Sequence, residues 1–210
     1  MKKLIFMLLL AAPMISLAQF SEYDFDIKKA TVVDEKITYT LIDTVENVDK
    51  NKLQSLLLEW VALKFRSATN VIKLNDKEAG KIIVKGLSSE NYSVRVLGTE
   101  GLYPYNQNFT IDFTVKDGRY RVIMTDFVIN IAATYSRYGS SAAQENAAET
   151  YLDNIPKIYD WEKLKNTEKK LLNINKNVVA NTYSSAKSTL QSIKDFIRKN
   201  MNSATKKDEF

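Results

Sequence analysis

The sequence predicts an α+β domain in which an antiparallel sheet carries helices on one face, and three observations support this class. Apolar and polar side chains alternate through residues 109–127 on both sides of Asp117-Gly118, which predicts a β-hairpin. Apolar residues of 49–66 fall on one broad arc at helical spacing. Residues 172–197 repeat apolar side chains in steps of seven, as in a long helix that packs along one side. The predicted order is β-α-β(4)-α with a long C-terminal helix.

The N-terminus has the three parts of a secretory signal peptide. Lys2 and Lys3 precede an apolar run that ends at Ile15, and Ser16-Leu17-Ala18 forms a small-x-small cleavage site. The run is too short to span a bilayer core of about 30 Å, which takes about 20 helical residues. We expect an exported protein, periplasmic or secreted, whose mature chain starts at Gln19 and has no transmembrane segment. No cysteine follows the run, so we do not expect a lipoprotein.

The same signals divide the chain along its length. The expected parts are a signal peptide at 1–18, an N-terminal extension at 19–35, an α+β core domain at 36–130, a connecting loop at 131–155, a C-terminal helical segment at 156–202 and a frayed tail at 203–210. The loop is expected because residues 132–148 are rich in alanine, glycine and serine. Pro156 is well placed to open the following helix.

The amino-acid composition excludes several kinds of chemistry. The chain contains no His and no Cys. Imidazole acid–base catalysis, Ser-His-Asp and Cys-His triads, thiol redox chemistry, disulfides and the usual zinc sites are therefore excluded. Carboxylate, lysine, serine and tyrosine chemistries remain.

The positive charge is concentrated in the C-terminal part of the chain. Residues 157–210 contain 12 basic and 6 acidic residues. A solvated, lysine-rich helical surface explains this excess. Binding of an anionic surface or nucleic acid through the tail is the alternative.

The first helix is preceded by one strand and followed by two short ones. Ile37, Tyr39 and Leu41 alternate with threonines, which predicts a strand. Asp49 is the expected N-cap of the helix. The apolar arc of the helix comprises Leu53, Leu56, Leu57, Leu58, Trp60, Val61, Leu63 and Phe65. Residues 71–74 and 81–85 are the expected short strands.

Residues 88–108 give mixed signals, because strand-like alternation at Tyr92, Val94 and Val96 is interrupted by Gly98 and Pro104. The hairpin that follows is better defined. A two-residue Asp-Gly loop favours a type I′ turn, which requires positive φ at both residues. Counting outward from this loop pairs Lys116 with Arg119, Asp112 with Ile123 and Phe109 with Asp126.

The long C-terminal helix is predicted to bury two rows of side chains. The rows are Leu172, Val179, Ala186 and Ile193, and Tyr183, Leu190 and Ile197, with Lys176 at the remaining position. Such a seam packs on the sheet or on another helix. We expect one portion to cover the sheet and the distal turns to allow a homo-oligomer.

Three stretches in this order resemble a known family. They are Glu59-Trp60, the segment DKEAGKIIVKG at 76–86 and the segment FTVKDGRYRVIMTDF at 113–127. Together they are similar to exported bacterial proteins known as domain of unknown function 4468, over roughly residues 36–128. The resemblance implies a TATA-binding-protein-like fold, and it brings no catalytic residue, cofactor or substrate. Trp161-Glu162-Lys163-Leu164 resembles the helical continuation of such proteins, whereas residues 91–106 depart from the family pattern.

Several polar groups could carry chemistry, but each has a simpler structural explanation. The register places Asp112 and Asp126 on opposite faces of the hairpin, which argues against a paired-carboxylate hydrolase. Ser88 or Ser89 with Lys85 would form a Ser-Lys dyad, but a solvated strand end explains them. The candidate calcium ligands Asn75, Asp76 and Glu78 lack the spacing of a calcium loop. Gly80 and Gly86 do not have phosphate-loop spacing.

The sheet face opposite the helices is the best candidate for a working surface. The expected residues of this face are Lys81, Ile83, Lys85, Thr110, Asp112, Thr114, Lys116, Arg119, Arg121, Ile123 and Thr125. Among them, Lys81, Lys85, Asp112, Arg119 and Arg121 form the candidate partner-binding site. Either the face is merely solvated, or it receives an acidic partner with Arg121 as anchor, because a guanidinium binds carboxylates through two parallel hydrogen bonds.

These observations favour an exported, non-catalytic binding or structural module. We expect no enzyme activity, cofactor or metal, and a partner that is a protein or another envelope component rather than nucleic acid. The alternatives are a hydrolase that uses carboxylates or a Ser-Lys pair, and a binder of anionic surfaces or nucleic acid through the basic tail.

Overall fold

The computed structural model describes residues 22–96, 99–136 and 139–204. The expected signal peptide lies outside these residues. The helices are η1 (Ile27–Lys29), α1 (Lys50–Lys64), α2 (Ala68–Val71), α3 (Ala148–Asp153), η2 (Trp161–Lys163) and α4 (Asn166–Ala204). The strands are β1 (Val32–Val33), β2 (Lys36–Ile37), β3 (Tyr39–Thr44), β4 (Ile72–Asp76), β5 (Lys81–Val96), β6 (Thr99–Lys116), β7 (Arg119–Ile131), β8 (Thr134–Ser136), β9 (Gly139–Ser141) and β10 (Gln144–Ala147).

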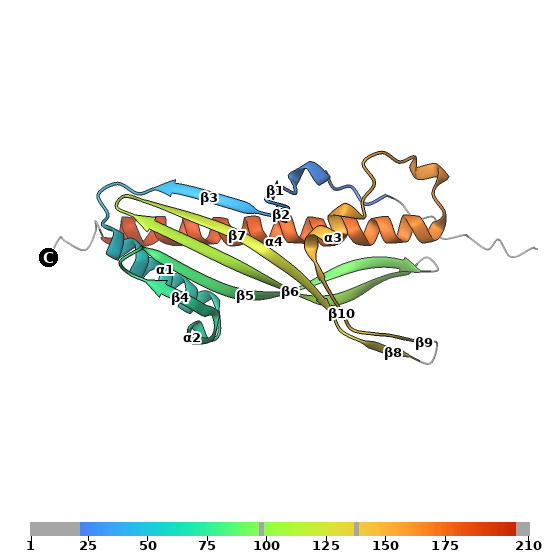
Figure 1. Cartoon of the computed structure of the whole chain (residues 1–210), viewed down its shortest axis with the longest axis horizontal. Helices are drawn as coiled ribbons and strands as arrows, with labels where there is room; N and C mark the ends of the chain where they lie inside the picture. Colours follow the sequence, from blue (N-terminus) through green and yellow to red (C-terminus); the bar gives the residue numbers. More distant parts are fainter. Residues whose placement is uncertain (1–21, 97–98, 137–138, 205–210) are drawn as a thin grey trace, which may run out of the picture.

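One antiparallel sheet organises the molecule, and its strand order is β10-β7-β6-β5-β4. β3 also pairs with β7, along Arg119 to Met124, and β10 pairs with the same strand further on, along Val128 to Ile131. In Figure 1, the long helix α4 runs behind this sheet. The predicted α+β class, with an antiparallel sheet and a long C-terminal helix, is confirmed.

The helix α1 forms as the sequence predicts, between the strands β3 and β4. The Asp49 carboxylate caps it by accepting a hydrogen bond from the Lys52 backbone N–H at 2.9 Å. Most of the apolar arc is buried, and Trp60 is 3% exposed. The prediction that Leu63 belongs to the buried arc is wrong, because Leu63 lies near the end of the helix and is 71% exposed.

The β6–β7 hairpin is confirmed, but the predicted type I′ turn is wrong. Gly118 has a φ of 69°, whereas Asp117 is not among the residues with positive φ. The segment before α1 holds the turn instead. Gly118 donates to the Val48 carbonyl at 2.8 Å, and the Lys50 backbone N–H donates to the Asp117 carboxylate at 2.7 Å.

The register of this hairpin changes at a β-bulge. Lys116 pairs with Arg119 and Asp112 with Ile123 as predicted, but the register shifts between Asn108 and Thr110. The predicted pairing of Phe109 with Asp126 is therefore wrong. Asp126 is the extra residue, and it takes a φ of 54°. A bulge adds one residue to one strand, and Asp tolerates positive φ better than most residues.

Residues 88–108 form strands rather than a loop. β5 and β6 pair without a register shift from Lys81↔Thr114 to Val96↔Thr99. The two strands therefore continue as an arm beyond the rest of the sheet (Figure 1). The rings of Tyr92 and Tyr103 stack across the two strands with centroids 5.5 Å apart, which stabilises the strand pairing against the turn preference of the glycine and proline residues in this arm.

The prediction of a connecting loop at 131–155 is wrong. This segment contains the β8–β9 hairpin, the sheet strand β10 and the helix α3. Tyr151 of α3 is 8% exposed, so this segment contributes to the core. The long helix α4 begins at Asn166 rather than at Pro156, after the short helix η2. Its end at Ala204 includes the first two residues of the expected frayed tail, and the remainder lies outside the described residues.

The seam of α4 packs on the chain's own sheet. With 39 residues, the helix extends over about 58 Å. Leu172, Val179, Ala186 and Ile193 are all at most 4% exposed, and Ile197 is fully buried. Because the chain itself covers these side chains, the seam supplies no argument for the expected homo-oligomer.

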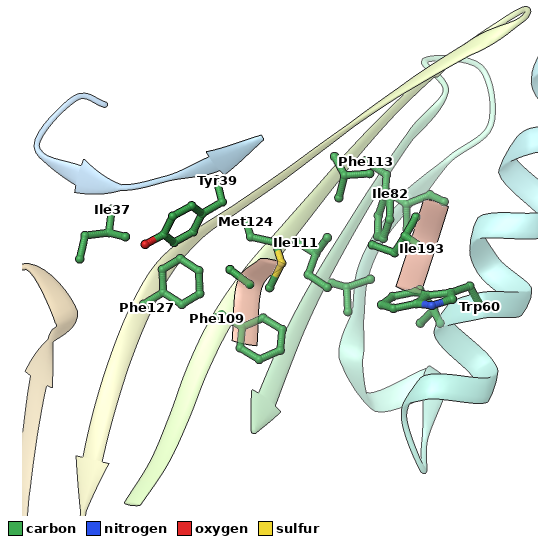
Figure 2. Close-up of a cluster of buried hydrophobic side chains, with 14 of the residues drawn as sticks. Ile37, Tyr39, Trp60, Ile82, Phe109, Ile111, Phe113, Met124, Phe127 and Ile193 are labelled. Atoms are coloured by element: carbon green, nitrogen blue, oxygen red, sulfur yellow. The ribbon is translucent and has the colours of Figure 1, made fainter. Parts of the chain in front are cut away.

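The core lies between the sheet and the helices α1 and α4. Figure 2 shows Trp60 of α1 and Ile193 of α4 lying near Phe113 and Ile82 of the sheet. The rings of Trp60 and Phe113 meet edge to face with centroids 6.3 Å apart. No helix within the described ranges is both long and apolar enough to cross a membrane.

Candidate partner-binding face of the sheet

Strand alternation places the predicted site residues on the face that α4 does not cover. Ile82 and Val84 are fully buried towards the helices, whereas Lys85 is exposed. On β7, Val122 is fully buried and Arg121 is exposed. We call this surface the open face, and it consists of Lys81, Ile83, Lys85, Thr110, Asp112, Thr114, Lys116, Arg119, Arg121, Ile123 and Thr125.

Two of the predicted site residues bind each other. The Lys81 ammonium lies 3.0 Å from the Asp112 carboxylate. The pair is part-buried, and no described residue gives a hydrogen bond to the second carboxylate oxygen of Asp112, which is shielded from solvent. This pair offers less net charge to a partner than the sequence suggests.

A cationic patch remains at the hairpin end of the open face, formed by Lys116, Arg119 and Arg121 beside Ile42. All three cations are exposed. Arg121 donates to the neutral hydroxyl of Thr114 over a long 3.4 Å contact, and no ion pair is found for it within the described residues. The patch borders a shallow hollow of about 260 Å³.

Ile42 is the part of this patch that the sequence analysis missed. It pairs with Arg121 across β3 and β7 and is 67% exposed. Its signal was present, because Ile42 follows Leu41 in a strand whose alternate side chains face inward. An exposed isoleucine beside a guanidinium gives the patch both an apolar and a charged contact.

Lys85 does not belong to this patch. The cross-strand rows are Lys81–Thr114–Arg121 and Lys85–Thr110–Thr125. These rows lie four residues apart along the strands, or about 13 Å. The structure therefore groups four of the five predicted site residues and places Lys85 beside a second feature.

That second feature is the bulge at Asp126. Its carboxylate lies 2.5 Å from the Lys36 ammonium. The Lys36 hydrogen bond lowers the pKa of Asp126, burial opposes this effect, and a Thr110 hydrogen bond supports it. The same pairing raises the pKa of Lys36. A groove of about 610 Å³, here called the bulge groove, lies next to it and is lined by Arg66, Lys73, Lys85, Leu87, Asn108 and Glu145, among others.

The prediction that Asp112 and Asp126 point to opposite faces is wrong. Asp126 reaches Thr110 and Lys36 and lines the bulge groove with Lys85, so it lies on the open-face side. The reason is the bulge, which turns its side chain out of the simple alternation. Each aspartate has a lysine partner of its own, and the lowered pKa of Asp126 keeps it ionised rather than suited to act as an acid.

The other candidate groups either lie on opposite faces of a strand or are held by structural contacts. Ser88 lies on the helix side and Lys85 on the open face, whereas the Ser89 hydroxyl binds the Asn106 side chain at 3.0 Å. In the turn at 75–78, the Asn75 side chain accepts from Gln54 and the Asp76 carboxylate accepts from the Ala79 N–H. Within the described ranges, no group of three or more acidic residues is arranged to hold a metal ion.

The N-terminal extension binds α4 through a buried lysine. Lys176 is 6% exposed and lies 2.5 Å from the Glu22 carboxylate, which also accepts a hydrogen bond from the Tyr159 hydroxyl. The Lys176 and Tyr159 hydrogen bonds lower the pKa of Glu22. Burial works against the charged form of Lys176, but the Glu22 and Tyr159 contacts outweigh it, so the pKa of Lys176 is raised. One cation of the basic tail is thus a structural anchor.

Comparison with known proteins agrees with this fold. Residues 39–130 match a family described as "Domain of unknown function (DUF4468) with TBP-like fold". A DUF4468 family protein from Bacteroides ovatus ATCC 8483 aligns with a TM-score of 0.54 and 14% identity, covering 79% of this chain and 90% of that one. A TBP-like protein from Parabacteroides distasonis ATCC 8503 aligns with a TM-score of 0.46 and 18% identity, covering 78% of this chain and 97% of that one. No curated protein sequence matches.

Proposed function

Since residues 39–130 match a domain of unknown function, DUF4468, that has a TBP-like fold, we propose a function from the surface of the sheet. The protein is an exported, non-catalytic binding module. Its open face receives an acidic partner at the cationic patch of Lys116, Arg119 and Arg121. A protein or another envelope component with exposed carboxylates has the matching chemistry.

The observation that carries this proposal is the environment of Arg121. Its guanidinium is exposed, its described contact is a long hydrogen bond to a neutral hydroxyl, and Ile42 beside it is 67% exposed. A bidentate carboxylate pair would satisfy the guanidinium better than Thr114 does. Exposed apolar surface next to unpaired charge is typical of a contact site.

Export is part of the proposal and rests on the N-terminal sequence. Residues 1–18 carry the charged start, apolar run and cleavage site of a signal peptide. Mass spectrometry of the protein from its native host is expected to show a chain that starts at Gln19. A chain retaining Met1 in the cytoplasmic fraction would contradict export.

The non-catalytic part rests on the chemistry that the residues offer. Without His or Cys, a hydrolase would depend on carboxylates or on a Ser-Lys pair. Asp112 and Asp126 are each held by a lysine, and Ser88 and Lys85 lie on opposite faces of β5. These arrangements favour binding over catalysis.

Binding of a labelled acidic peptide to matched charge variants tests the proposal. The probe is a fluorescein-labelled peptide of alternating Glu and Leu, which offers carboxylates to the arginines and apolar side chains to Ile42. We expect Arg121→Glu to weaken binding at least tenfold, because a charge-assisted hydrogen bond contributes about 1.5–3 kcal/mol. Lys52→Glu, an equal charge change at an exposed position of α1, is the control.

Salt and peptide charge supply two further controls. Binding is expected to weaken as salt rises, because exposed charges are screened, and a Lys-Leu peptide is expected not to bind. If Arg121→Glu and Lys52→Glu bind the acidic peptide equally well, the open face is merely solvated and the proposal fails.

A further inference from the structure

Among the residues that the structure describes, no strand pairs with the outer edge of β5 beyond the end of β4. β4 pairs with β5 only as far as Ile72↔Val84, whereas β5 continues to Val96. In Figure 1, β4 lies at one end of the sheet and β5 runs on past it. An unpaired strand edge offers backbone N–H and C=O groups to an additional strand.

The direction of these backbone groups follows from two contacts. The Val115 N–H donates to the Gly80 carbonyl at 2.7 Å, so even-numbered residues of this strand point their backbone groups towards β6. The Asn181 side chain of α4 donates to the Asn91 carbonyl at 2.7 Å from the other side, so odd-numbered residues point outward. The β5–β6 register is unbroken between these contacts. The outward groups of Leu87 and Ser89 therefore have no strand partner within residues 22–96, 99–136 and 139–204.

A hollow lies on each side of this edge. On the open face is the bulge groove, which Lys85 and Leu87 border together with Arg66 and Lys73 of the α1–β4 segment. On the helix side is a groove of about 350 Å³ between β5 and α4, which Ser88 borders. The Ser88 hydroxyl is shielded from solvent and finds no hydrogen-bond partner in the described part of the chain.

These two hollows match the side-chain alternation of an added strand. Successive side chains of a strand point to opposite faces, so one would enter the bulge groove and the next would enter the helix-side groove. In peptide recognition by strand addition, backbone hydrogen bonds give affinity and such alternate hollows give specificity. Leu87 is 55% exposed and would be covered by the added strand.

Charge identifies the kind of segment that fits. Arg66, Lys73 and Lys85 line the bulge groove. The Asp126 carboxylate of this groove is already bound to Lys36, which leaves Glu145 as the other acid on its rim. The helix-side groove is lined by four serines, among them Ser184 and Ser188 of α4, and by one lysine and one acid, Lys64 and Glu90, whose charges balance. Acidic side chains thus suit the first groove and small hydroxyl side chains suit the second.

We propose that the β5 edge from Leu87 to Asn91 is a docking site for an extended acidic segment of a partner, which adds a strand next to β5. The segment alternates Glu or Asp with Ser or Thr. The docking site on β5 is bounded at one end by α2 and at the other by the contact of Asn181 with Asn91. This site is separate from the cationic patch at Arg121 and does not depend on it.

Amide hydrogen exchange of the full mature chain with a Thr-Glu-Thr-Glu-Thr peptide tests the proposal directly. The Leu87 and Ser89 amides are expected to become at least tenfold slower to exchange when the peptide is bound. The Ser88 and Glu90 amides, which already point towards β6, are expected to change much less. Equal or absent protection at these four positions would overturn the proposal.

Affinity measurements with two disruptions complete the test. A peptide N-methylated at alternate residues keeps its charges but loses backbone donors, and we expect it to bind at least tenfold more weakly. Ser89→Pro removes an outward N–H and should have the same effect on the unmodified peptide, whereas Lys52→Glu, at an exposed position of α1 outside both sites, should leave its affinity unchanged. The N-methylated peptide on the unaltered protein gives the result even if Ser89→Pro fails to fold.

Two other results would contradict strand addition. If the N-methylated peptide binds as well as the parent and Arg121→Glu abolishes binding, the peptide occupies the cationic patch and only the proposed function stands. If the edge amides are protected in the free protein in a concentration-dependent way, the edge is occupied by a second copy of the chain.

Discussion

Two adjacent leucines on α4 give the sharpest test of how this helix packs. Leu172 is 4% exposed and belongs to the core, whereas Leu171 is 60% exposed. Truncating a buried leucine to alanine costs about 2–5 kcal/mol, since transfer free energy is lost and a cavity is left. Truncating an exposed one costs within about 0.5 kcal/mol. Leu172→Ala and Leu171→Ala therefore make the same chemical change at neighbouring positions with very different expected effects.

Urea denaturation of the mature chain would measure both changes in the free energy of unfolding. For a chain of this size, each kcal/mol corresponds to about 2–4 °C in the thermal midpoint. Leu172→Ala is thus expected to lower the midpoint by roughly 4–20 °C, and Leu171→Ala by at most about 2 °C. The losses should not vary with protein concentration. Equal losses in the two variants, or a concentration-dependent loss, would refute the packing of this seam on the chain's own sheet.

Two further predictions concern the cap of α1 and the bulge. Asp49→Ala removes the acceptor for the Lys52 N–H and should lower the free energy of unfolding, measured in urea, by about 1 kcal/mol. Asp49→Ser should retain most of the stability. Equal free energies of unfolding for the two variants would contradict the cap. The pKa of Asp126 is lower in the folded state than its ordinary value, so its ion pair stabilises the fold above about pH 4 and is lost as the pH falls below that. Asp126→Asn should therefore be less stable than the unaltered protein at neutral pH and should lose less stability between pH 5 and pH 3. Asp24→Asn, at an exposed position, is the control. If both variants lose the same stability over this pH range, the role of Asp126 is contradicted.

Local patterning was sufficient to predict the centre of the sheet. Residues 109–116 alternate cleanly, and the facing strand alternates with them up to Thr125. The open face and its arginines followed from this alternation alone. An N-cap at Asp49 was equally readable, because a capping carboxylate acts within a few residues of its own position.

What the sequence left undetermined depends on contacts between distant segments. The Asp117-Gly118 turn was predicted from local preference, but Val48 and Lys50 hold it in another conformation. No local signal marks Asp126 as a bulge residue, because its conformation is supported by Lys36 and by Thr110 across the strands.

For a similar reason the segment at 88–108 was left undecided between strand and loop, and the segment at 131–155 was wrongly predicted as a loop. Their glycines, prolines and small residues favour loops locally, but pairing with a neighbouring strand and contact with α4 outweigh that preference. The free edge of β5 could not be predicted, since it depends on where β4 ends. Ile42 could have been found, because it continues the outward row of Thr38 and Thr40.

The central claim is that the open face binds acidic partners at the cationic patch, and an NMR titration with the Glu-Leu peptide tests it most directly. We predict that the largest amide shifts fall on Ile42, Thr114, Arg119 and Arg121, and that Arg121→Glu abolishes them. Amides of the opposite surface, such as those of Lys187 and Gln191 on α4, should not shift. Shifts that cluster on α4, or none that saturate on the open face, would contradict the claim.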